Sequence, residues 1–388
     1  MEGGRRVKFL ILTFQAGEGH NSAARAVLEQ MQQEGHEGEI VDFLGLLSDK
    51  LSKVINDGYV TLVKRAPFLY GFGYRFSDGT SGIFRNGFRS PLYLDSAIVS
   101  KRLRDYLDTH GPYDGIVATH LMPSQALAHL KKHNYPLPTT VSVVTDYTWY
   151  PYWQEIAACD YCVVPNESLI DLYVQKGIPR EMLRPYGIPV SRRFSALPTR
   201  AEARAQLGFS DDEKLFLVMG GSMGAGNMRR FVKRLFKYKG DAQMVVICGK
   251  NEQLKASLEK KFFGKRGIRI VGFTTDVPVY MMACDVLYTK PGGLSTSEAL
   301  ICRIPMVHTA PIPGQETDNM KFFAKKGCSF GSKRMSLQLY YGLRLMSSEE
   351  LRAQMRAEQA KCAKPHAARD IVRLVAGEEG DVFMGKTF

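Results

Sequence analysis

The chain has 388 residues and a mass of 43.5 kDa. This length exceeds the roughly 250 to 300 residues at which a single hydrophobic core stops growing, so the sequence predicts two domains. Its 45% hydrophobic and 23% charged residues exclude a disordered chain, and its net charge of +13 favours anionic partners such as nucleic acids, nucleotides or anionic lipid headgroups.

The cysteines and the amino terminus indicate the expected environment. The seven cysteines are scattered, and the close pair Cys159 and Cys162 has no second Cys or His pair at the spacing of a zinc site. We therefore expect reduced thiols and no bound metal. The apolar run 7–14 is too short to span a membrane and has no small-residue cleavage site, so we expect no signal peptide and a cytoplasmic location.

Short apolar runs alternate with helical stretches along the first half of the chain. A helix is expected from about residue 20 to residue 33. The expected strands are 7–14, 39–43, 114–119, 139–145 and 160–165. Since helical stretches separate most of these strands, the half resembles a parallel sheet with crossover helices.

The alternation restarts after residues 187–200, which contain two prolines, a glycine and three arginines and read as a linker. The expected strands of the second half are 214–220, 243–249, 268–273, 285–290 and 304–310. The predicted class is therefore α/β, with two Rossmann-like, doubly wound domains facing each other. Ligands of such sheets bind at the carboxyl ends of the strands, so every strand-to-helix turn is a candidate site.

The first candidate turn is FQAGEGHNSAA, residues 14–24. Gly17 and Gly19 permit a tight turn, and His20 is expected in the first turn of the following helix. As a dinucleotide fingerprint the stretch is incomplete, because Ser22 replaces the third glycine, although Asp42 ends the second strand. A structural role for His20, in capping or packing, remains open from the residues alone.

The second candidate turn is MGGSMGAGN, residues 219–227. Its four glycines leave main-chain N–H groups accessible and Ser222 adds a hydroxyl, which suits a diphosphate at the amino end of a helix starting near Asn227. The Lys-Ser/Thr ending of an ATP-binding loop is missing, so an ATPase is disfavoured. A merely flexible loop remains possible.

Two further turns are TKPGGLSTSEAL, residues 289–300, and PIPGQETDN, residues 311–319. In the first, Ser295 or Thr296 is expected to cap a helix whose first turn contains Glu298. A carboxylate in that place also favours the helix dipole, so Glu298 alone is ambiguous. The donors and acceptors of Gln315, Glu316 and Asn319 in the second turn add the mixture that a hydroxyl-rich ligand needs.

These motifs carry a family resemblance. The ordered set is GEGHNSAA, VTDYTWYPYW, VMGGSMGAGN, VICGKN, VGFTTDVPVYMMACDVLYTKPGGLSTSEAL and PIPGQETDN. The chain resembles the diacylglycerol glycosyltransferases, which include bacterial processive glucosyltransferases and plant monogalactosyldiacylglycerol synthases of glycosyltransferase family 28. It is more distantly similar to the peptidoglycan enzyme that adds N-acetylglucosamine to a lipid-linked acceptor. The likeness extends from about residue 7 to residue 330.

The resemblance implies a GT-B fold with three parts: a lipid-acceptor domain at 1–190, a UDP-sugar domain at 191–364, and a last helix, 365–388, returning to the first domain. It implies that Glu298 binds the ribose hydroxyls and that Phe273 lies against the uracil. Gln315, Glu316 and Asn319 would bind the sugar. The remaining implied donor-binding residues are Gly221, Ser222, Met223, Gly224, Gly249, Asn251, Gly292 and Gly293.

The implied chemistry needs no metal or other cofactor, because helix amino ends and cations can stabilise the leaving diphosphate. Lys250 and Lys290 lie near it in motif order, yet we expect both to be solvated surface charges. His20 would be the base that removes the acceptor proton in an inverting transfer. Its unperturbed pKa of about 6.5 suits this role.

On the acceptor side, the resemblance implicates Gly19, Asp146, Tyr147 and Tyr150. The family has a histidine where this chain has Tyr150, and a tyrosine cannot act as a base at neutral pH. That substitution leaves open a different acceptor preference, or a catalytically silent nucleotide-sugar-binding protein. The residues alone also leave open an NAD-dependent oxidoreductase, and the resemblance leaves open transfer to another lipid-linked acceptor.

Segment 51–104 alternates aromatic side chains with lysines and arginines. About half of the rings are expected in a core, and the rest suit insertion among lipids with cations at phosphate level. We therefore expect a peripheral protein on the cytoplasmic face of a bacterial cell membrane. The expected partners are a UDP-sugar, diacylglycerol and an anionic membrane surface, without nucleic acid. The sequence does not select the hexose, single or repeated addition, or the oligomeric state.

Overall fold

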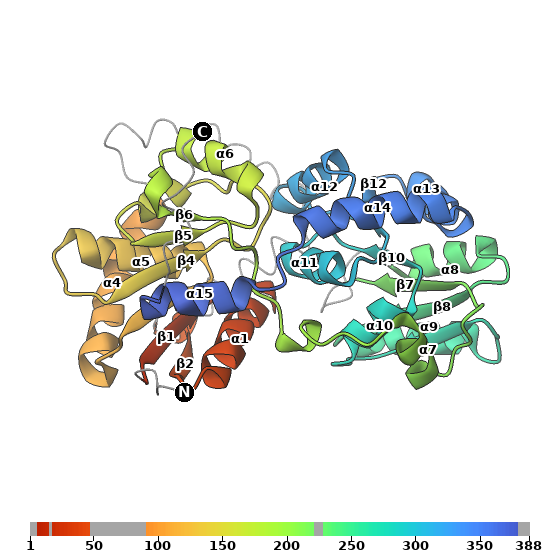
Figure 1. Cartoon of the computed structure of the whole chain (residues 1–388), viewed down its shortest axis with the longest axis horizontal. Helices are drawn as coiled ribbons and strands as arrows, with labels where there is room; N and C mark the ends of the chain where they lie inside the picture. The colour runs from red at the N-terminus through yellow and green to blue at the C-terminus, as the bar shows by residue number, and fades with distance from the viewer. Residues whose placement is uncertain (1–5, 15–17, 47–90, 221–227, 379–388) are drawn as a thin grey trace. The chain divides into compact units, whose positions relative to one another are not determined.

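The computed structural model describes residues 6–14, 18–46, 91–220 and 228–378, with the helical backbone alone for residues 91–98. The chain divides into two compact units, one of Met1–Arg192 with His366–Phe388 and one of Arg193–Pro365 (Figure 1). Within the described residues, each unit contains a parallel six-stranded sheet flanked by helices. The predicted α/β class with two doubly wound sheets is confirmed.

The first unit has the strand order β2-β1-β3-β4-β5-β6. The strands are β1 Lys8–Thr13, β2 Glu37–Asp42, β3 Gly115–Ala118, β4 Thr139–Val143, β5 Tyr161–Val163 and β6 Leu183–Arg184. The helices are α1 Glu18–Gln33, α4 Pro91–His110, α5 Leu121–Lys132, α6 Ile170–Gln175 and α15 Ala367–Ala376. Four 3-10 helices complete the described elements of this unit, η1 Phe43–Leu46, η2 Trp153–Ile156, η3 Glu167–Leu169 and η4 Arg180–Met182, and a fifth, η5 Arg192–Phe194, crosses into the second unit.

Helix α15, the last helix of the described residues, packs in the first unit (Figure 1). Buried side chains of α1 and α15 form one core cluster with strands β1, β3, β4 and β5. Helix α15 approaches β3 so closely that a Cβ atom on Gly115 would lie 2.4 Å from Cγ2 of Val375. The glycine at residue 115 is therefore required by packing.

The second unit has the strand order β12-β11-β10-β7-β8-β9. The strands are β7 Leu215–Met219, β8 Gln243–Ile247, β9 Ile268–Val271, β10 Val286–Thr289, β11 Met306–His308 and β12 Phe330–Gly331. The helices are α7 Arg200–Leu207, α8 Met228–Tyr238, α9 Glu252–Phe262, α10 Val277–Ala283, α11 Gly293–Cys302, α12 Gln315–Lys325, α13 Met335–Ser347 and α14 Glu349–Cys362. Helices α8, α9, α13 and α14 share one core cluster with the sheet.

The ten strands predicted from apolar runs are all present, with ends shifted by a few residues. The prediction missed β6 and β12, because each has two residues and no apolar run of its own. Helix α1 contains His20 in its first turn, β2 ends at Asp42, and α12 begins at Gln315, as expected.

Both sheets reverse their strand order at a central pair of strands. In the first unit β1 lies between β2 and β3, and in the second unit β7 pairs with β8 on one side and β10 on the other. Crossover helices leave the two strands of such a pair toward opposite faces, which opens a crevice at their carboxyl ends. The loops that follow β1 and β3, and those that follow β7 and β10, are therefore the places where each unit can hold a ligand.

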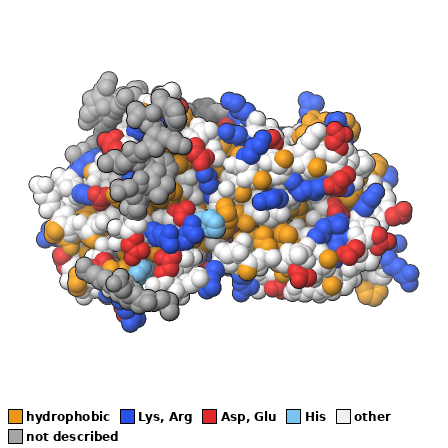
Figure 2. All heavy atoms as spheres, viewed as in Figure 1, with side chains coloured by type: hydrophobic (Ala, Val, Ile, Leu, Met, Phe, Trp, Pro, Cys, Tyr) orange, Lys and Arg blue, Asp and Glu red, His pale blue; other side chains and the backbone are white. Residues whose placement is uncertain are grey.

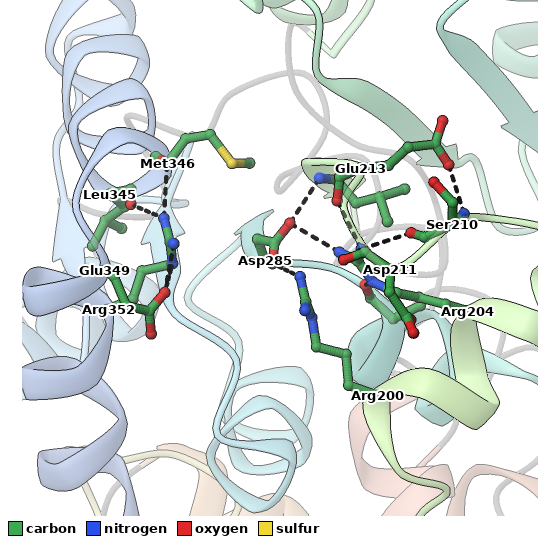
Figure 3. A network of polar contacts seen from close by, with 12 residues as sticks. Arg200, Arg204, Ser210, Asp211, Glu213, Asp285, Leu345, Met346, Glu349 and Arg352 are labelled. Atoms are coloured by element: carbon green, nitrogen blue, oxygen red, sulfur yellow. Dashed lines mark hydrogen bonds and ion pairs between the residues drawn. The ribbon is translucent and has the colours of Figure 1, made fainter.

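A buried arginine fastens α7 to the second sheet (Figure 3). Arg204 has no exposed surface, and its guanidinium donates to the carbonyl oxygens of Ser210, Asp211, Glu213 and Ala283 at 2.7 to 2.9 Å. Its Nη2 also lies 3.1 Å from Oδ2 of Asp285. Asp285 in turn accepts from Leu215 N–H at 2.8 Å, so the network holds the starts of β7 and β10 together.

A similar device joins α13 to α14 (Figure 3). Arg352 Nη1 donates to the carbonyl oxygens of Leu345 and Met346, each at 2.7 Å, and Nη2 pairs with Glu349 at 2.5 Å. Carbonyl groups in the last turn of a helix lack the usual main-chain donor four residues on, and this side chain from α14 supplies donors to two of them.

Among the helices of the described ranges, none is both long enough and apolar enough to span a membrane. All seven cysteines are buried and unpaired by disulfides.

We expect Arg204→Leu to lower the free energy of unfolding of the second unit by about 3 to 5 kcal/mol, since it removes the donor to four carbonyl groups and one of the ion-pair partners of the nearly buried Asp285. The control Arg200→Ala removes a half-exposed arginine from the same Asp285 and should cost about 1 kcal/mol or less. Both tryptophans, Trp149 and Trp153, lie in the first unit, so fluorescence follows that unit and far-ultraviolet circular dichroism follows both. Equal losses in the two variants would contradict a structural role for Arg204.

Candidate active site

The polar side chains of the first unit gather where β1 and β3 end. His20 lies in the first turn of α1, which follows β1, and Thr119 follows β3 directly. Nδ1 of His20 is 2.8 Å from the carbonyl oxygen of Thr119 and 3.0 Å from Oγ1 of Thr145, which follows β4. Thr119 Oγ1 also donates to the carbonyl oxygen of His20 at 3.2 Å. Three loops thus fix one imidazole at the reversal of the strand order.

The contact with Thr119 assigns the tautomer of His20. A carbonyl oxygen can only accept a hydrogen bond, so Nδ1 carries the proton and Nε2 of the neutral ring keeps a lone pair. Burial lowers the pKa of His20 from its ordinary 6.5, although the hydrogen bond to Thr119 acts in the opposite direction. The ring is therefore neutral at pH 7, the state that a general base requires.

A second histidine, which the sequence analysis did not consider, lies against the first. The rings of His20 and His120 contact edge to face with centroids 4.7 Å apart, and His120 stacks on Phe14 at 4.4 Å. Nδ1 of His120 accepts the Met122 N–H at 3.2 Å and caps α5. Burial, together with the neighbouring His20, lowers the pKa of His120 well below 6.5. The sequence feature that could have revealed His120 is its position just after a predicted buried strand.

The residues assigned to the acceptor follow β1 and β4, the same strands that precede His20 and Thr145. A Cβ atom on Gly19 would meet no described atom within 4 Å, so packing does not require this glycine. Asp146 and Tyr150 are half-buried in the segment after β4, whereas Tyr147 is buried. Trp149 packs edge to face on the buried Tyr173, with centroids 5.0 Å apart. The segment that contains Tyr150 is therefore held in place by a core contact.

In the second unit, the turn between β10 and α11 is the best-described part of the predicted donor site. Helix α11 begins at Gly293, and Gly292 is its N-cap with φ −73° and ψ 143°, values open to any residue. A Cβ atom on Gly292 would meet nothing within 4 Å. Neither the backbone nor the described packing requires glycine there. Gly221, Ser222, Met223 and Gly224 lie outside the described residues.

Glu298 is a half-buried carboxylate on α11. In the described part of the chain it has no hydrogen bond or ion pair, and burial raises its pKa from 4.5 to about 8. An acidic group kept in such surroundings without a partner is typical of a binding site, because a ligand can supply the missing donors.

Two expectations about this turn are wrong. Neither Ser295 nor Thr296 caps α11, because both lie inside the helix, and Thr296 Oγ1 instead donates back to the carbonyl oxygen of Gly292 at 2.7 Å. Since the helix begins at Gly293, Glu298 falls in its second turn, and the favourable dipole at the helix start does not explain it.

Lys290 was expected to be a solvated surface charge, and this is also wrong. Its side chain is 12% exposed, and Nζ lies 3.4 Å from Oε1 of Glu316. The other oxygen of Glu316 accepts the Ile312 N–H at 2.7 Å. The ion pair therefore joins the turn after β10 to the first turn of α12.

The turn before α12 is built around one glycine and one amide. Gly314 has φ 103° and ψ −130°, a conformation that is essentially restricted to glycine, and it places Gln315 at the start of α12. Asn319 is fully buried, and its Nδ2 donates to the carbonyl oxygen of Pro291 at 3.0 Å. Asn319 thus fixes the position of the Gly292 turn.

The turns after β8 and β9 hold the last predicted donor residues. Gly249 has φ 60°, and Asn251 Oδ1 accepts the Leu254 N–H at 2.9 Å as the N-cap of α9. Phe273 is 63% exposed, and Nζ of the exposed Lys250 lies 5.7 Å from the centre of its ring. An exposed ring at the carboxyl end of a strand is a surface on which a flat base can stack.

Both halves of the chain are similar in sequence to known glycosyltransferases. Residues 20–190 match the family model described as monogalactosyldiacylglycerol synthase, and residues 215–375 match the carboxy-terminal domain of glycosyltransferase family 28. A processive diacylglycerol β-glucosyltransferase of Staphylococcus saprophyticus is 28% identical over 82% of this chain and 80% of that protein. The protein of the same name from Bacillus mycoides is 26% identical over 96% of this chain and 94% of that protein.

Solved structures agree on the fold. Acinetobacter baumannii MurG has a TM-score of 0.59 at 15% identity and covers 96% of this chain and 100% of its own. Anabaena Alr3699/HepE in complex with UDP has a TM-score of 0.55 at 11% identity, with 96% of this chain and 99% of its own covered.

The two parallel six-stranded sheets have the GT-B fold, and the two family models identify the class of the protein as a glycosyltransferase with that fold. The chain belongs to the family of the monogalactosyldiacylglycerol synthases and diacylglycerol β-glucosyltransferases, within glycosyltransferase family 28, and is a hexosyltransferase. This membership excludes two hypotheses from the sequence, an NAD-dependent oxidoreductase and a catalytically silent nucleotide-sugar-binding protein.

The raised pKa of Glu298 predicts a trade-off between stability and binding. Because its folded pKa of about 8 exceeds the ordinary 4.5, the folded state binds more protons between these values, and the stability of the unliganded protein falls as pH rises from 4.5 to 8. Glu298→Gln is therefore expected to raise the melting temperature relative to wild type at pH 8 and to change it little at pH 5. Since the resemblance assigns this carboxylate to ribose, the variant should also bind UDP roughly tenfold or more weakly by calorimetry.

The matched control is Glu350→Gln, which changes an exposed glutamate of α14. It should alter neither the pH dependence of the melting temperature nor UDP binding. If Glu298→Gln behaved like this control, Glu298 would be an ordinary surface carboxylate.

Proposed function

We propose that the protein is an inverting glycosyltransferase that moves a hexose from a UDP-sugar to the hydroxyl of diacylglycerol, or of a glycosyl-diacylglycerol. The observation that carries the proposal is the neutral His20 at the reversal of strand order in the first sheet, with Nδ1 held by the Thr119 carbonyl and Nε2 able to accept a proton. The family membership supports the acceptor, because the relatives are named as diacylglycerol glucosyltransferases.

In the proposed reaction, the acceptor hydroxyl oxygen attacks the anomeric carbon of the donor sugar from the face opposite UDP. The new carbon–oxygen bond forms as the bond from that carbon to the β-phosphate oxygen breaks, and UDP leaves with the electron pair. Nε2 of His20 takes the hydroxyl proton. An α-linked donor therefore gives a β-linked glycolipid.

The donor is proposed to bind at the carboxyl ends of the second sheet. Glu298 would accept hydrogen bonds from the ribose hydroxyls, which fits its lack of a partner among the described residues. The exposed ring of Phe273 would stack on the uracil. Structural neighbours solved with UDP, such as Alr3699/HepE, support the choice of nucleotide.

Other residues would act on the diphosphate and the sugar. Gly221, Ser222, Met223, Gly224, Gly292 and Gly293 would offer main-chain N–H groups to the diphosphate, so no metal would be needed. The side-chain amide of Gln315 would form hydrogen bonds with the sugar hydroxyls directly. We propose that Glu316 and Asn319 act mainly by holding the turns, because Glu316 already binds Lys290 and Ile312, and Asn319 binds Pro291. Gly249 and Asn251 would shape the turn after β8.

The lipid is proposed to enter beside Gly19, Asp146, Tyr147 and Tyr150. Tyr150 would contact the acceptor and leave the proton transfer to His20. The protein would work as a peripheral enzyme at the cytoplasmic face of the membrane. Segment 51–104, whose greater part lies outside the described residues, would supply further lipid contacts.

The function is tested by incubation with a panel of UDP-hexoses and diacylglycerol in neutral detergent micelles. We expect a β-linked glycosyl-diacylglycerol, identified by mass and anomeric configuration, together with released UDP, and we expect both to persist in EDTA. An α-linked product, or hydrolysis of the donor without a lipid product, would contradict the proposed reaction. Transfer to a polyprenyl phosphate alone would favour another lipid-linked acceptor.

His20→Ala is expected to lower kcat by roughly 100- to 10,000-fold, with UDP affinity within about twofold of wild type. Because the pKa of His20 lies below 6.5, the wild-type kcat/KM should fall only as pH drops below that value, and this acid limb should vanish in the variant. His133→Ala, which changes an exposed histidine at the end of α5, is the matched control. Activity of His20→Ala within a few-fold of the control would exclude His20 as the base.

A further inference from the structure

The second unit has two stretches of chain that are rich in exposed cations and contain no acidic residue. No Asp or Glu occurs between Glu213 and Asp241, or between Glu259 and Asp276. The exposed cations that these stretches place on α8 and at the end of α9 are Arg229, Arg230, Lys233, Arg234, Lys237, Lys260, Lys261, Lys265 and Arg266. We call this set the α8–α9 surface. The face of the molecule shown in Figure 2 has cations and acids interspersed.

Helix α8 separates apolar from cationic side chains completely. Met228, Phe231, Val232 and Leu235 are buried in the core of the second unit. The five cations of α8 occupy the opposite face, along a stripe of roughly 12 Å at 1.5 Å per residue. None of the nine cations of the α8–α9 surface has an ion-pair partner among the described residues. Their charges are therefore available to an anion from outside the chain.

An exposed aromatic ring, that of Phe263, lies in a hydrogen-bonded turn within this surface. Phe263 is 89% exposed, although its neighbour Phe262 is buried in the core. The Lys265 N–H donates to the Phe262 carbonyl at 2.9 Å, and Phe263 has φ −51° and ψ 129° before Gly264 at φ 69°. These values define a type II turn, which requires glycine at its third position.

A contact between aromatic rings brings α8 and the end of α9 together. Phe236 of α8 and Phe262 of α9 pack with ring centroids 4.9 Å apart. Tyr238, at the end of α8, is 54% exposed. Both helix ends precede strands β8 and β9, so the exposed rings lie at the amino edge of the sheet, opposite the turns of the proposed donor site.

We propose that the α8–α9 surface binds an anionic lipid bilayer, with Phe263 inserted at the level of the headgroups. An exposed aromatic ring among cations on a rigid turn suits an interface that is apolar below and negatively charged above. The inference rests on the proposed function, because an enzyme that glycosylates diacylglycerol must work at a bilayer. It adds that the second unit, and not only the acceptor-binding unit, holds the enzyme there.

The test measures co-sedimentation of the full chain with vesicles of phosphatidylcholine, alone or with 30% (roughly physiological) phosphatidylglycerol. Wild type should bind the anionic vesicles, and binding should fall as salt rises. Lys237→Glu/Lys261→Glu and Phe263→Ser are each expected to reduce the partition coefficient by roughly tenfold or more. The control Lys325→Glu/Lys333→Glu makes the same charge change at exposed positions near the β12 edge and should bind within about twofold of wild type.

Product formation from diacylglycerol in neutral micelles separates this inference from the proposed function. Variants of the α8–α9 surface should keep wild-type turnover in micelles and lose it on anionic vesicles. If wild type lacked turnover in micelles, the proposed function would fail whatever the vesicle result. Vesicle binding by the α8–α9 variants equal to that of the control would overturn the inference, as would a preference of wild type for RNA over anionic vesicles in competition.

Discussion

The arrangement of both candidate sites depends on one constraint, the parallel pairing of every strand in each sheet. Parallel pairing sends all carboxyl ends to the same edge, and the reversal of strand order separates the crossover helices there. In the first sheet this brings together His20, Thr119 and Thr145, which are separated by up to 125 residues in the chain. In the second sheet it brings the Lys290 turn beside the start of α12.

The two units present different side chains at this edge. The first presents imidazoles whose burial keeps them neutral, and a main-chain carbonyl decides which nitrogen of His20 carries the proton. The second presents glycines, an exposed ring and a carboxylate without a partner in the described chain. Under the proposed function, the group that accepts a proton and the set that recognises a nucleotide would lie in these two different surroundings.

The sequence predicted what depends on local pattern and missed what depends on long-range contact. Buried strands appear as apolar runs, so all ten of the longer strands were found, whereas β6 and β12 rely on pairing with a neighbour. Lys290 reads as a surface charge until α12 is seen to bring Glu316 to it, and His120 gains meaning only when β3 is known to lie beside β1. The start of α11 was misjudged because Gly292, not a serine or threonine, is its N-cap.

The central claim is that the second unit binds uridine diphosphate at the carboxyl ends of its strands, and crystallography of the protein with UDP tests it most directly. The account predicts both ribose hydroxyls within hydrogen-bond distance of the Glu298 carboxylate and the uracil ring against Phe273. Well-ordered UDP held by the first unit, or at another edge of the second sheet, would contradict it.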